Sequence, residues 1–126
     1  MPESTVVLHY VYVLVRSDMP LADQMVQVGH ACLEAGRRFC QPEAVSHLVV
    51  LSVRSQAQLR DAAREAEAMG IRCLVFNEPD DGLGHTAACT EPITGMHRPI
   101  FRRFRLWEAP QAGTPGCERP IQNATG

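Results

Sequence analysis

The chain has 126 residues, 45% of them hydrophobic, and a formal net charge of −2 at pH 7. This length and composition predict one globular domain with a hydrophobic core. The near-neutral charge excludes a wholly basic nucleic-acid-binding surface, although a local basic patch is compatible with it. All 12 residues in the Lys+Arg total are arginines, so mechanisms that need a lysine are excluded.

The sequence contains neither a run of about 18 apolar residues nor a basic leader before an apolar segment, so neither a membrane span nor a signal peptide is predicted. We therefore expect a cytoplasmic protein. The cysteines are scattered, form no C-x-x-C pair and mostly lie in apolar patterns, which favours buried free thiols over disulfides or a zinc site. They are Cys32, Cys40, Cys73, Cys89 and Cys117.

The stretch from Val6 to Gly36 predicts a strand, a tight turn and an amphipathic helix. Residues 6–15 are rich in β-branched and aromatic side chains with little polar alternation, as in a strand covered on both faces. Asp18 is a predicted N-cap, and Pro20 fits the first turn of a helix that ends at Gly36. Apolar residues at helical spacing predict its core-facing stripe, namely Leu21, Met25, Val28 and Cys32.

The rest of the chain continues the alternation of strands and helices. We expect strands at 47–53, 71–76 and 85–90, a helix at 56–69 and a loop at 77–84. Residues 96–107 favour a short helix, although a short strand also fits, and the Pro/Gly-rich residues 108–126 predict a tail outside a 1–107 domain. Two successive strand–helix–strand units predict a three-layer α/β/α fold, with helices on both faces of a mixed, mainly parallel sheet of about four strands.

Parallel strands place their carboxyl ends at one edge of a sheet, where ligands bind in open α/β folds. An antiparallel strand at 85–90 would start at the same edge. We therefore expect this edge to gather acid, amide, hydroxyl, imidazole and guanidinium groups beside a helix N-terminus, which favours anions. The groups are Arg16, Ser17, Asp18, Arg54, Ser55, Asn77, Glu78, Asp80, His85 and Thr86.

Each candidate also has an ordinary structural interpretation. Residues 78–82 have the composition of an ordinary exposed turn. His30 could be only a partly buried histidine in the middle of a helix. Thr86 starts a predicted strand, where threonine is a common residue type. One basic cluster interleaves with aromatic residues and could bind phosphates, or could form the solvated face of an amphipathic terminal element. Its members are Arg98, Arg102, Arg103 and Arg105.

Four short motifs follow one another along residues 10–107. They are Arg16-Ser17-Asp18, then Gln27-Val28-Gly29-His30-Ala31, then Glu78 with Pro79-Asp80, and Thr86 before Pro92. Their order and spacing resemble the type-two peptidyl-tRNA hydrolases of archaea and eukaryotes and their bacterial and phage relatives.

The resemblance implies hydrolysis of the ester that joins a peptide to the 3′ end of tRNA, and it places the family's glutamine, carboxylate and strand threonine at Gln27, Glu78 and Thr86. In a hydrolase, Glu78 or Asp80 would activate water, with His85 as a second candidate base. Thr86, Gln27 and backbone N–H groups would stabilise the oxyanion. No cofactor is needed, in agreement with the missing phosphate-loop and metal motifs. The expected substrate-binding residues are Arg16, Asp18, Asp23, Gln24, His30, Arg102 and Arg103.

The chain departs from the family pattern at three positions. The family's lysine falls on Asp23, and two threonine positions fall on Gly82 and Gly84. Two like unit charges 4 Å apart repel by about 4 kcal/mol at an effective dielectric of 20, so an aspartate at the lysine position opposes the usual pose of a tRNA phosphate. A catalytically inactive tRNA- or anion-binding module and a protein-interaction domain are the alternative functions, and a homodimer is possible.

Overall fold

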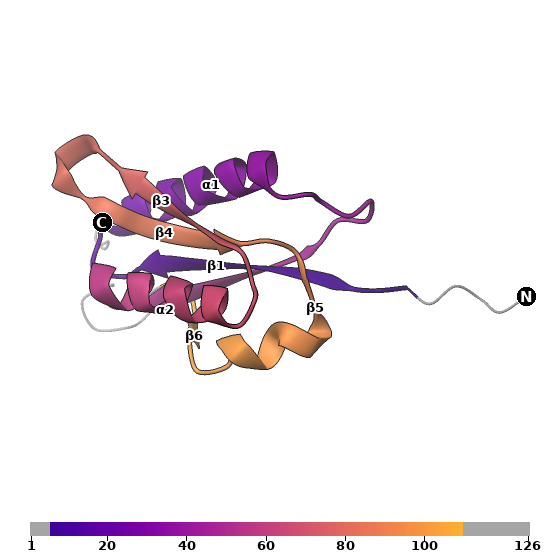
Figure 1. Cartoon of the computed structure of the whole chain (residues 1–126). Coiled ribbons are helices and arrows are strands. Elements are labelled where there is room, and N and C mark those ends of the chain that lie inside the picture. The colour runs from indigo at the N-terminus through magenta and orange to yellow at the C-terminus, as the bar shows by residue number, and fades with distance from the viewer. Residues whose placement is uncertain (1–5, 110–126) are drawn as a thin grey trace, which may run out of the picture.

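The computed structural model describes residues 6–109, which form a mixed α/β fold around one six-stranded sheet (Figure 1). The strands are β1 (His9–Arg16), β2 (His47–Val53), β3 (Cys73–Glu78), β4 (Gly84–Thr90), β5 (Ile93–Thr94) and β6 (Arg105–Leu106). The helices are α1 (Leu21–Arg38) and α2 (Gln56–Ala68), with 3-10 segments η1 (Asp80–Gly82) and η2 (Gly95–Phe101).

The sheet is mixed, as predicted, but it has six strands rather than about four. Its order is β3-β4-β1-β2-β6, with β5 paired to β1. Among the described strands only β1 and β2 pair in parallel, so the expectation of a mainly parallel sheet is wrong. The reason is that β4 lies antiparallel between β1 and β3. Strands β1, β2 and β3 nevertheless point the same way, and their carboxyl ends share an edge with the start of β4.

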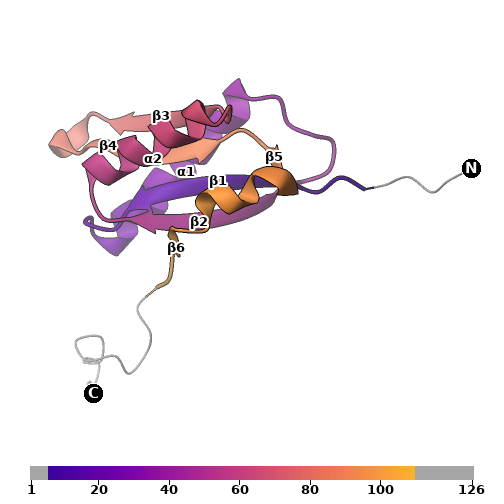
Figure 2. The ribbon, with the colours of Figure 1, turned by 60° about the horizontal axis from the view of Figure 1, so that its bottom comes forward.

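Both faces of the central strand β1 are buried. Val13 and Val15 pack with the small residues of α1, while Tyr12 and Leu14 pack with residues of α2 and η2. Figures 1 and 2 show α1 over one face of the sheet and α2 with η2 over the other. This two-sided burial explains why the sequence of β1 shows so little polar alternation.

Helix α2 follows the sequence pattern closely. Ser55 caps its N-terminus, since the Ser55 hydroxyl accepts a hydrogen bond from the Gln58 N–H at 3.1 Å. The apolar stripe is buried and the charged residues face outward. The buried residues are Leu59, Ala62, Ala63 and Ala66.

Helix α1 departs from its prediction at both its cap and its buried face. Its N-cap is Pro20, which provides no side-chain cap, because the Asp18 carboxylate is instead paired with Arg16. The predicted core stripe is wrong: Leu21 and Met25 are exposed, and Val28 and Cys32 are only half-buried. The residues that α1 buries are Gln24, Gln27, Ala31 and Ala35.

Several boundaries also differ from the predictions. Strand β1 starts at His9, α1 continues to Arg38, and β3 extends to Glu78, so the predicted acidic loop residue ends a strand. Residues 96–107 contain η2 and then the short strand β6, so both interpretations hold in part. Free thiols occur at Cys32, Cys40, Cys73 and Cys89, although Cys40 is exposed. Cys117 and the predicted tail beyond Ala109 lie outside the described residues.

Candidate functional site

A hydrogen-bonded chain links three of the predicted site residues at the shared edge of the sheet. The Thr86 hydroxyl donates to Gln27 Oε1 at 2.5 Å, and Gln27 Nε2 donates to Glu78 Oε1 at 2.9 Å. Thr86 is fully buried and Gln27 is only 4% exposed, whereas Glu78 is half-buried. The chain therefore runs from the interior to a carboxylate at the surface, and each amide atom of Gln27 has a partner.

A β-bulge explains why Thr86 reaches α1. Along β3 and β4, Phe76 lies opposite Ala87 and Asn77 lies opposite His85, so the pairing skips Thr86. Such an extra residue breaks the alternation of side chains and re-aims one of them. The Thr86 hydroxyl consequently contacts α1, while the neighbouring imidazole of His85 accepts from Arg60 Nε of α2 at 2.9 Å.

Glu78 is held in its ionised form. Its hydrogen bond from Gln27 lowers the pKa of the Glu78 carboxyl below the ordinary 4.5, and the Asp80 N–H, which donates to Glu78 Oε2 at 3.2 Å, acts in the same direction. The charge of nearby His30 contributes less to this lowering. His30 itself is exposed and stacks on Phe76, with ring centroids 4.9 Å apart. The edge thus presents a carboxylate that is ionised at neutral pH, flanked by an imidazole.

The Arg16 guanidinium hydrogen-bonds to the turns near Glu78 and does not project into solvent. Its guanidinium holds the Asp18 carboxylate through two hydrogen bonds of 2.9 and 3.0 Å, and donates to the carbonyl oxygens of Leu83 and His85 at 2.7 and 3.1 Å. The hydrogen bond from Arg16 lowers the pKa of the Asp18 carboxyl. Both residues therefore position the β1–α1 turn and the start of β4, and neither has a free charged group for a ligand.

Gln24 and Asp23 occupy different surroundings on the first turns of α1. Gln24 is 7% exposed, donates to the Met19 carbonyl at 2.7 Å and accepts from Trp107 Nε1 at 2.7 Å. Trp107 was not among the site residues predicted from the sequence. The signal that could have identified it is its indole N–H, which needs a hydrogen-bond acceptor when the ring is buried. Asp23 is half-buried and, within residues 6–109, makes no side-chain hydrogen bond or ion pair.

The two glycines at the family's threonine positions are required by the loop. Gly82 and Gly84 have φ values of +65° and +73°, which side chains rarely tolerate, and a Cβ on Gly84 would clash with the side chain of Gln56. Asp81, which lies between Asp80 and Gly82, also has a positive φ, of 56°. This loop therefore offers backbone and carboxylate groups instead of hydroxyls.

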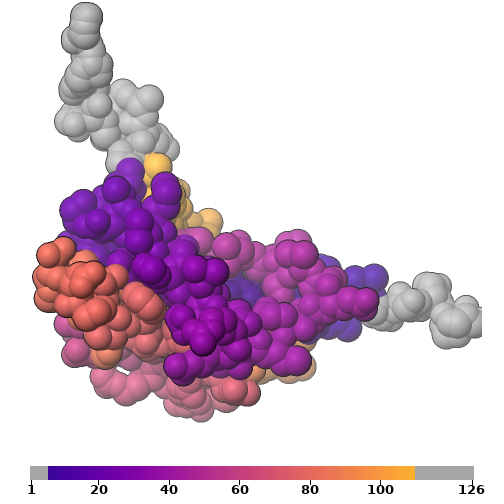
Figure 3. Space-filling view, turned by 90° about the horizontal axis from the view of Figure 1, so that it is seen from above, coloured from indigo at the N-terminus to yellow at the C-terminus, as the bar shows by residue number. Residues whose placement is uncertain are grey.

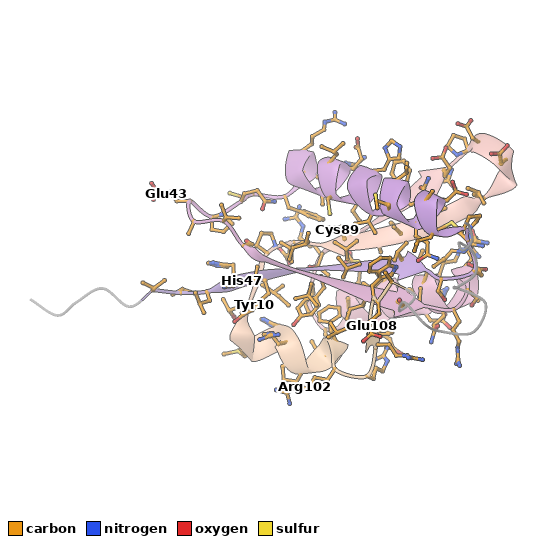
Figure 4. The ribbon with its side chains drawn as sticks, turned by 180° about the vertical axis from the view of Figure 1, so that it is seen from behind. Tyr10, Glu43, His47, Cys89, Arg102 and Glu108 are labelled. Atoms are coloured by element: carbon orange, nitrogen blue, oxygen red, sulfur yellow. The ribbon has the colours of Figure 1, made fainter. Side chains whose placement is uncertain are left out.

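Arg102, which directly follows η2, lies on the side of the sheet that η2 covers, away from α1 (Figure 4). Arg103 pairs with Glu65 and covers the Phe104 ring, while Arg102 is exposed. Arg103 also lines a surface pocket of about 580 Å³ that reaches Ser17 at the carboxyl edge of β1. The charged groups that line this pocket are Arg54, Arg103, Arg105 and Glu108.

The structure thus brings together Gln27, Glu78, Asp80 and Thr86. It separates them from His85 and from Arg102 and Arg103, which follow η2. Within residues 6–109, no group of three or more His, Cys, Asp or Glu side chains could hold a metal ion. No helix in the same range is long and apolar enough to cross a membrane. The sequence matches no family model and no curated protein.

Proposed function

We propose that the protein is a divergent hydrolase of the peptidyl-tRNA type, which cleaves an ester at the 3′ end of tRNA. The observation that carries the proposal is the hydrogen-bonded chain from Thr86 through Gln27 to Glu78. Three separate elements supply these residues, and the family resemblance assigns catalytic roles to the same three positions. We also propose that the fold is a three-layer α/β/α arrangement, in which α1 forms one outer layer and α2 with η2 forms the other.

Glu78 is the residue that would act on water. Its ionised carboxylate accepts a hydrogen bond from a water molecule, whose oxygen attacks the carbonyl carbon of the ester while its proton moves to Glu78. The bond from this carbon to the ribose oxygen then breaks, and the ribose oxygen takes up the proton. The N–H groups in the first turn of α1 lie before the first helical hydrogen bond, and they are the donors for the oxyanion.

Gln27 and Thr86 then have a different role from the oxyanion stabilisers that the sequence predicted. Both are buried, and the hydroxyl proton of Thr86 is used in the bond to Gln27. They are positioning residues that fix the carboxylate of Glu78 and favour its ionised form. Asp80 contributes through its backbone N–H, and its exposed side chain lies beside the carboxylate.

A second candidate, a tRNA- or anion-binding module without turnover, is favoured by Asp23. This carboxylate lies on α1 near the site and repels a phosphate there. A ligand phosphate would instead meet the pocket lined by Arg54, Arg103 and Arg105, which reaches the same edge of the sheet through Ser17. Binding at this pocket should weaken steeply with salt, since arginine–phosphate contacts release counterions.

The decisive experiment is hydrolysis of an N-acetylated aminoacyl-tRNA by the purified protein and by Glu78→Gln. We expect turnover by the wild type and a loss of about 100-fold or more in kcat for Glu78→Gln, because the amide cannot accept the proton of water. Asp81→Asn is the matched control, since it removes a carboxylate from the loop that follows Glu78 and keeps a residue that tolerates positive φ.

The variants also separate the two candidates. Equal rates for the wild type and Glu78→Gln would refute the role of Glu78 and with it the proposed hydrolase site. Binding of tRNA without turnover, weakened by Arg54→Gln with Arg105→Gln, would support the binding module instead. If the protein neither hydrolyses nor binds the tRNA, both candidates are contradicted, and the protein-interaction domain is the alternative that is left.

A further inference from the structure

A small pocket lies beside η2, on the face of the sheet opposite α1. Segment η2 packs over β1 through the stacked rings of Tyr12 and Phe101, whose centroids are 4.3 Å apart, and it leads into β6 beside β2 (Figure 2). The pocket has a volume of about 260 Å³. Helix α1, which faces the viewer in Figure 3, covers the other face of the sheet, and neither Gln27 nor Glu78 lines this pocket.

The polar side chains of the pocket offer only hydrogen-bond donors. Arg98 and Arg102 carry guanidinium groups, which have N–H donors and no acceptor. The Tyr12 hydroxyl accepts a hydrogen bond from Arg98 Nε at 2.7 Å, and within residues 6–109 its own O–H has no acceptor. Because Tyr12 is only 4% exposed, an unused donor there costs free energy that an acceptor bound in the pocket would recover.

The Arg98 guanidinium is held in position but keeps its charge free for a ligand. Its Nε is bound to Tyr12, and its central carbon lies 4.0 Å from the centroid of the Tyr10 ring. Among the ion pairs of residues 6–109, none includes Arg98 or Arg102. The terminal N–H groups of a fixed guanidinium match the two oxygens of a carboxylate, which they can bind through two parallel hydrogen bonds. The pocket is therefore prepared for an anion.

The remaining lining residues are apolar and define the body of that anion. Leu51 and Phe101 are buried, Phe104 is half-buried, and Leu106 is 63% exposed beside them. A free phosphate ion would leave this apolar wall in contact with water, whereas an organic acid would cover it. The volume is below the roughly 300–1,000 Å³ that is usual for sites of drug-sized ligands, so the acid that fits is small.

We propose that this pocket binds a small monocarboxylic acid with an aromatic or short aliphatic body. Arg98, Arg102 and the Tyr12 O–H bind the carboxylate, and the body covers Phe104 and Leu106. Arg102 then has a ligand other than the tRNA phosphate expected from the sequence. The pocket shares no residue with the proposed ester site and lies on the opposite face of the sheet, so either proposal can fail while the other holds.

An NMR titration of the full chain with phenylacetate tests the ligand class. We expect a dissociation constant of about 1 mM or lower, with shifted backbone amide signals in η2 and β6. Phenylacetamide keeps the ring without the charge, and inorganic phosphate keeps a charge without the ring. Each should bind at least about tenfold more weakly than phenylacetate. No binding of phenylacetate, equal binding of phosphate, or shifts centred on Glu78 would overturn the proposal.

Substitutions in the pocket test the residues. Tyr12→Phe removes the hydroxyl and keeps the ring that stacks on Phe101, and it should raise the dissociation constant for phenylacetate about 5–10-fold. Arg98→Gln should raise it at least about tenfold, because it removes the charged donor. Arg37→Gln is the matched control, since this side chain is 75% exposed at the end of α1, and it should leave the dissociation constant unchanged.

A further variant covers the case in which Arg98→Gln does not fold, which circular dichroism would show. Arg102→Gln changes an exposed side chain and should still weaken phenylacetate binding about fivefold. Wild-type affinity in both Tyr12→Phe and Arg102→Gln would overturn the assignment of these residues. An equal loss of affinity in Arg37→Gln would show nonspecific attraction to arginine and would overturn the pocket itself.

Discussion

Helices α1 and α2 cover opposite faces of the same sheet but are built in opposite ways. Helix α2 has a serine cap and buries a leucine and alanine stripe, as its sequence pattern predicts. Helix α1 has no side-chain cap, buries two glutamines and exposes methionine, valine and leucine. The difference shows that α2 buries an apolar face as an ordinary surface helix does, whereas α1 places polar side chains beneath it and leaves apolar ones exposed.

The largest expected effect is the loss of stability when a buried leucine of α2 is truncated, compared with an exposed leucine of α1. Leu59 of α2 is completely buried, and Leu59→Ala should lower the free energy of unfolding by about 2–5 kcal/mol through the cavity it leaves. Urea denaturation measures this loss. The matched change Leu33→Ala on the exposed face of α1 should cost under about 1 kcal/mol. Equal losses at the two leucines would contradict the contrast between the helices.

The next effect concerns the buried glutamine of α1. Gln27→Leu leaves the Thr86 hydroxyl without its acceptor, and we expect a loss of about 1–3 kcal/mol in stability. Adding Thr86→Val should recover much of that loss, because an apolar pair needs no hydrogen bond. A double-mutant cycle by urea denaturation measures the coupling, and additive losses would show that the hydrogen bond contributes nothing.

A smaller effect compares the two helix N-termini. Ser55→Ala removes the cap of α2 and should cost about 1 kcal/mol. Asp18→Ala removes no cap from α1 and breaks only a partly exposed ion pair, so we expect about 0.5 kcal/mol, which decreases as salt is added. Thermal melts at low and high salt measure both. A larger loss for Asp18→Ala would show that it caps α1 after all.

The glycines of the two helices should respond with opposite signs. Gly29→Ala should stabilise the protein by about 0.5–1 kcal/mol, because the helical φ and the open space around Gly29 accept a methyl group. Gly70→Ala, after α2, should destabilise it, because its φ of +86° suits glycine alone. Urea denaturation measures both signs, and a destabilised Gly29→Ala variant would contradict the open space at this position.

The smallest effect appears as a pH dependence. Because the pKa of Glu78 is lowered from 4.5 in the folded state, its ionised form contributes stability that is fully present above 4.5 and is lost as the pH falls through the lowered value. The difference in Tm between the wild type and Glu78→Gln should therefore be constant above pH 4.5 and decrease below it. A difference that persists unchanged at lower pH would refute this assignment.

The meeting of Glu78 and Thr86 could be anticipated, because the strand directions follow from the alternation of elements, whereas Gln27 was placed with them by the family resemblance alone. The buried face of α1 could not be predicted from the sequence. Its apolar residues predict one stripe, but the burial of Gln24 and Gln27 depends on hydrogen bonds to Trp107, Thr86 and Glu78, which are remote in sequence. The position of His85 was missed for a similar reason, since the bulge at Thr86 reverses the expected face.

The hydrogen bond between Trp107 and Gln24 has a consequence for the order of folding. It joins residues 83 positions apart and requires β6 to be in place beside β2. Contacts of such long sequence separation form late, so we expect the polar side of α1 to become fixed after the sheet has assembled. The indole of Trp107, the single tryptophan of the chain, then provides an intrinsic fluorescence signal for this last step of assembly.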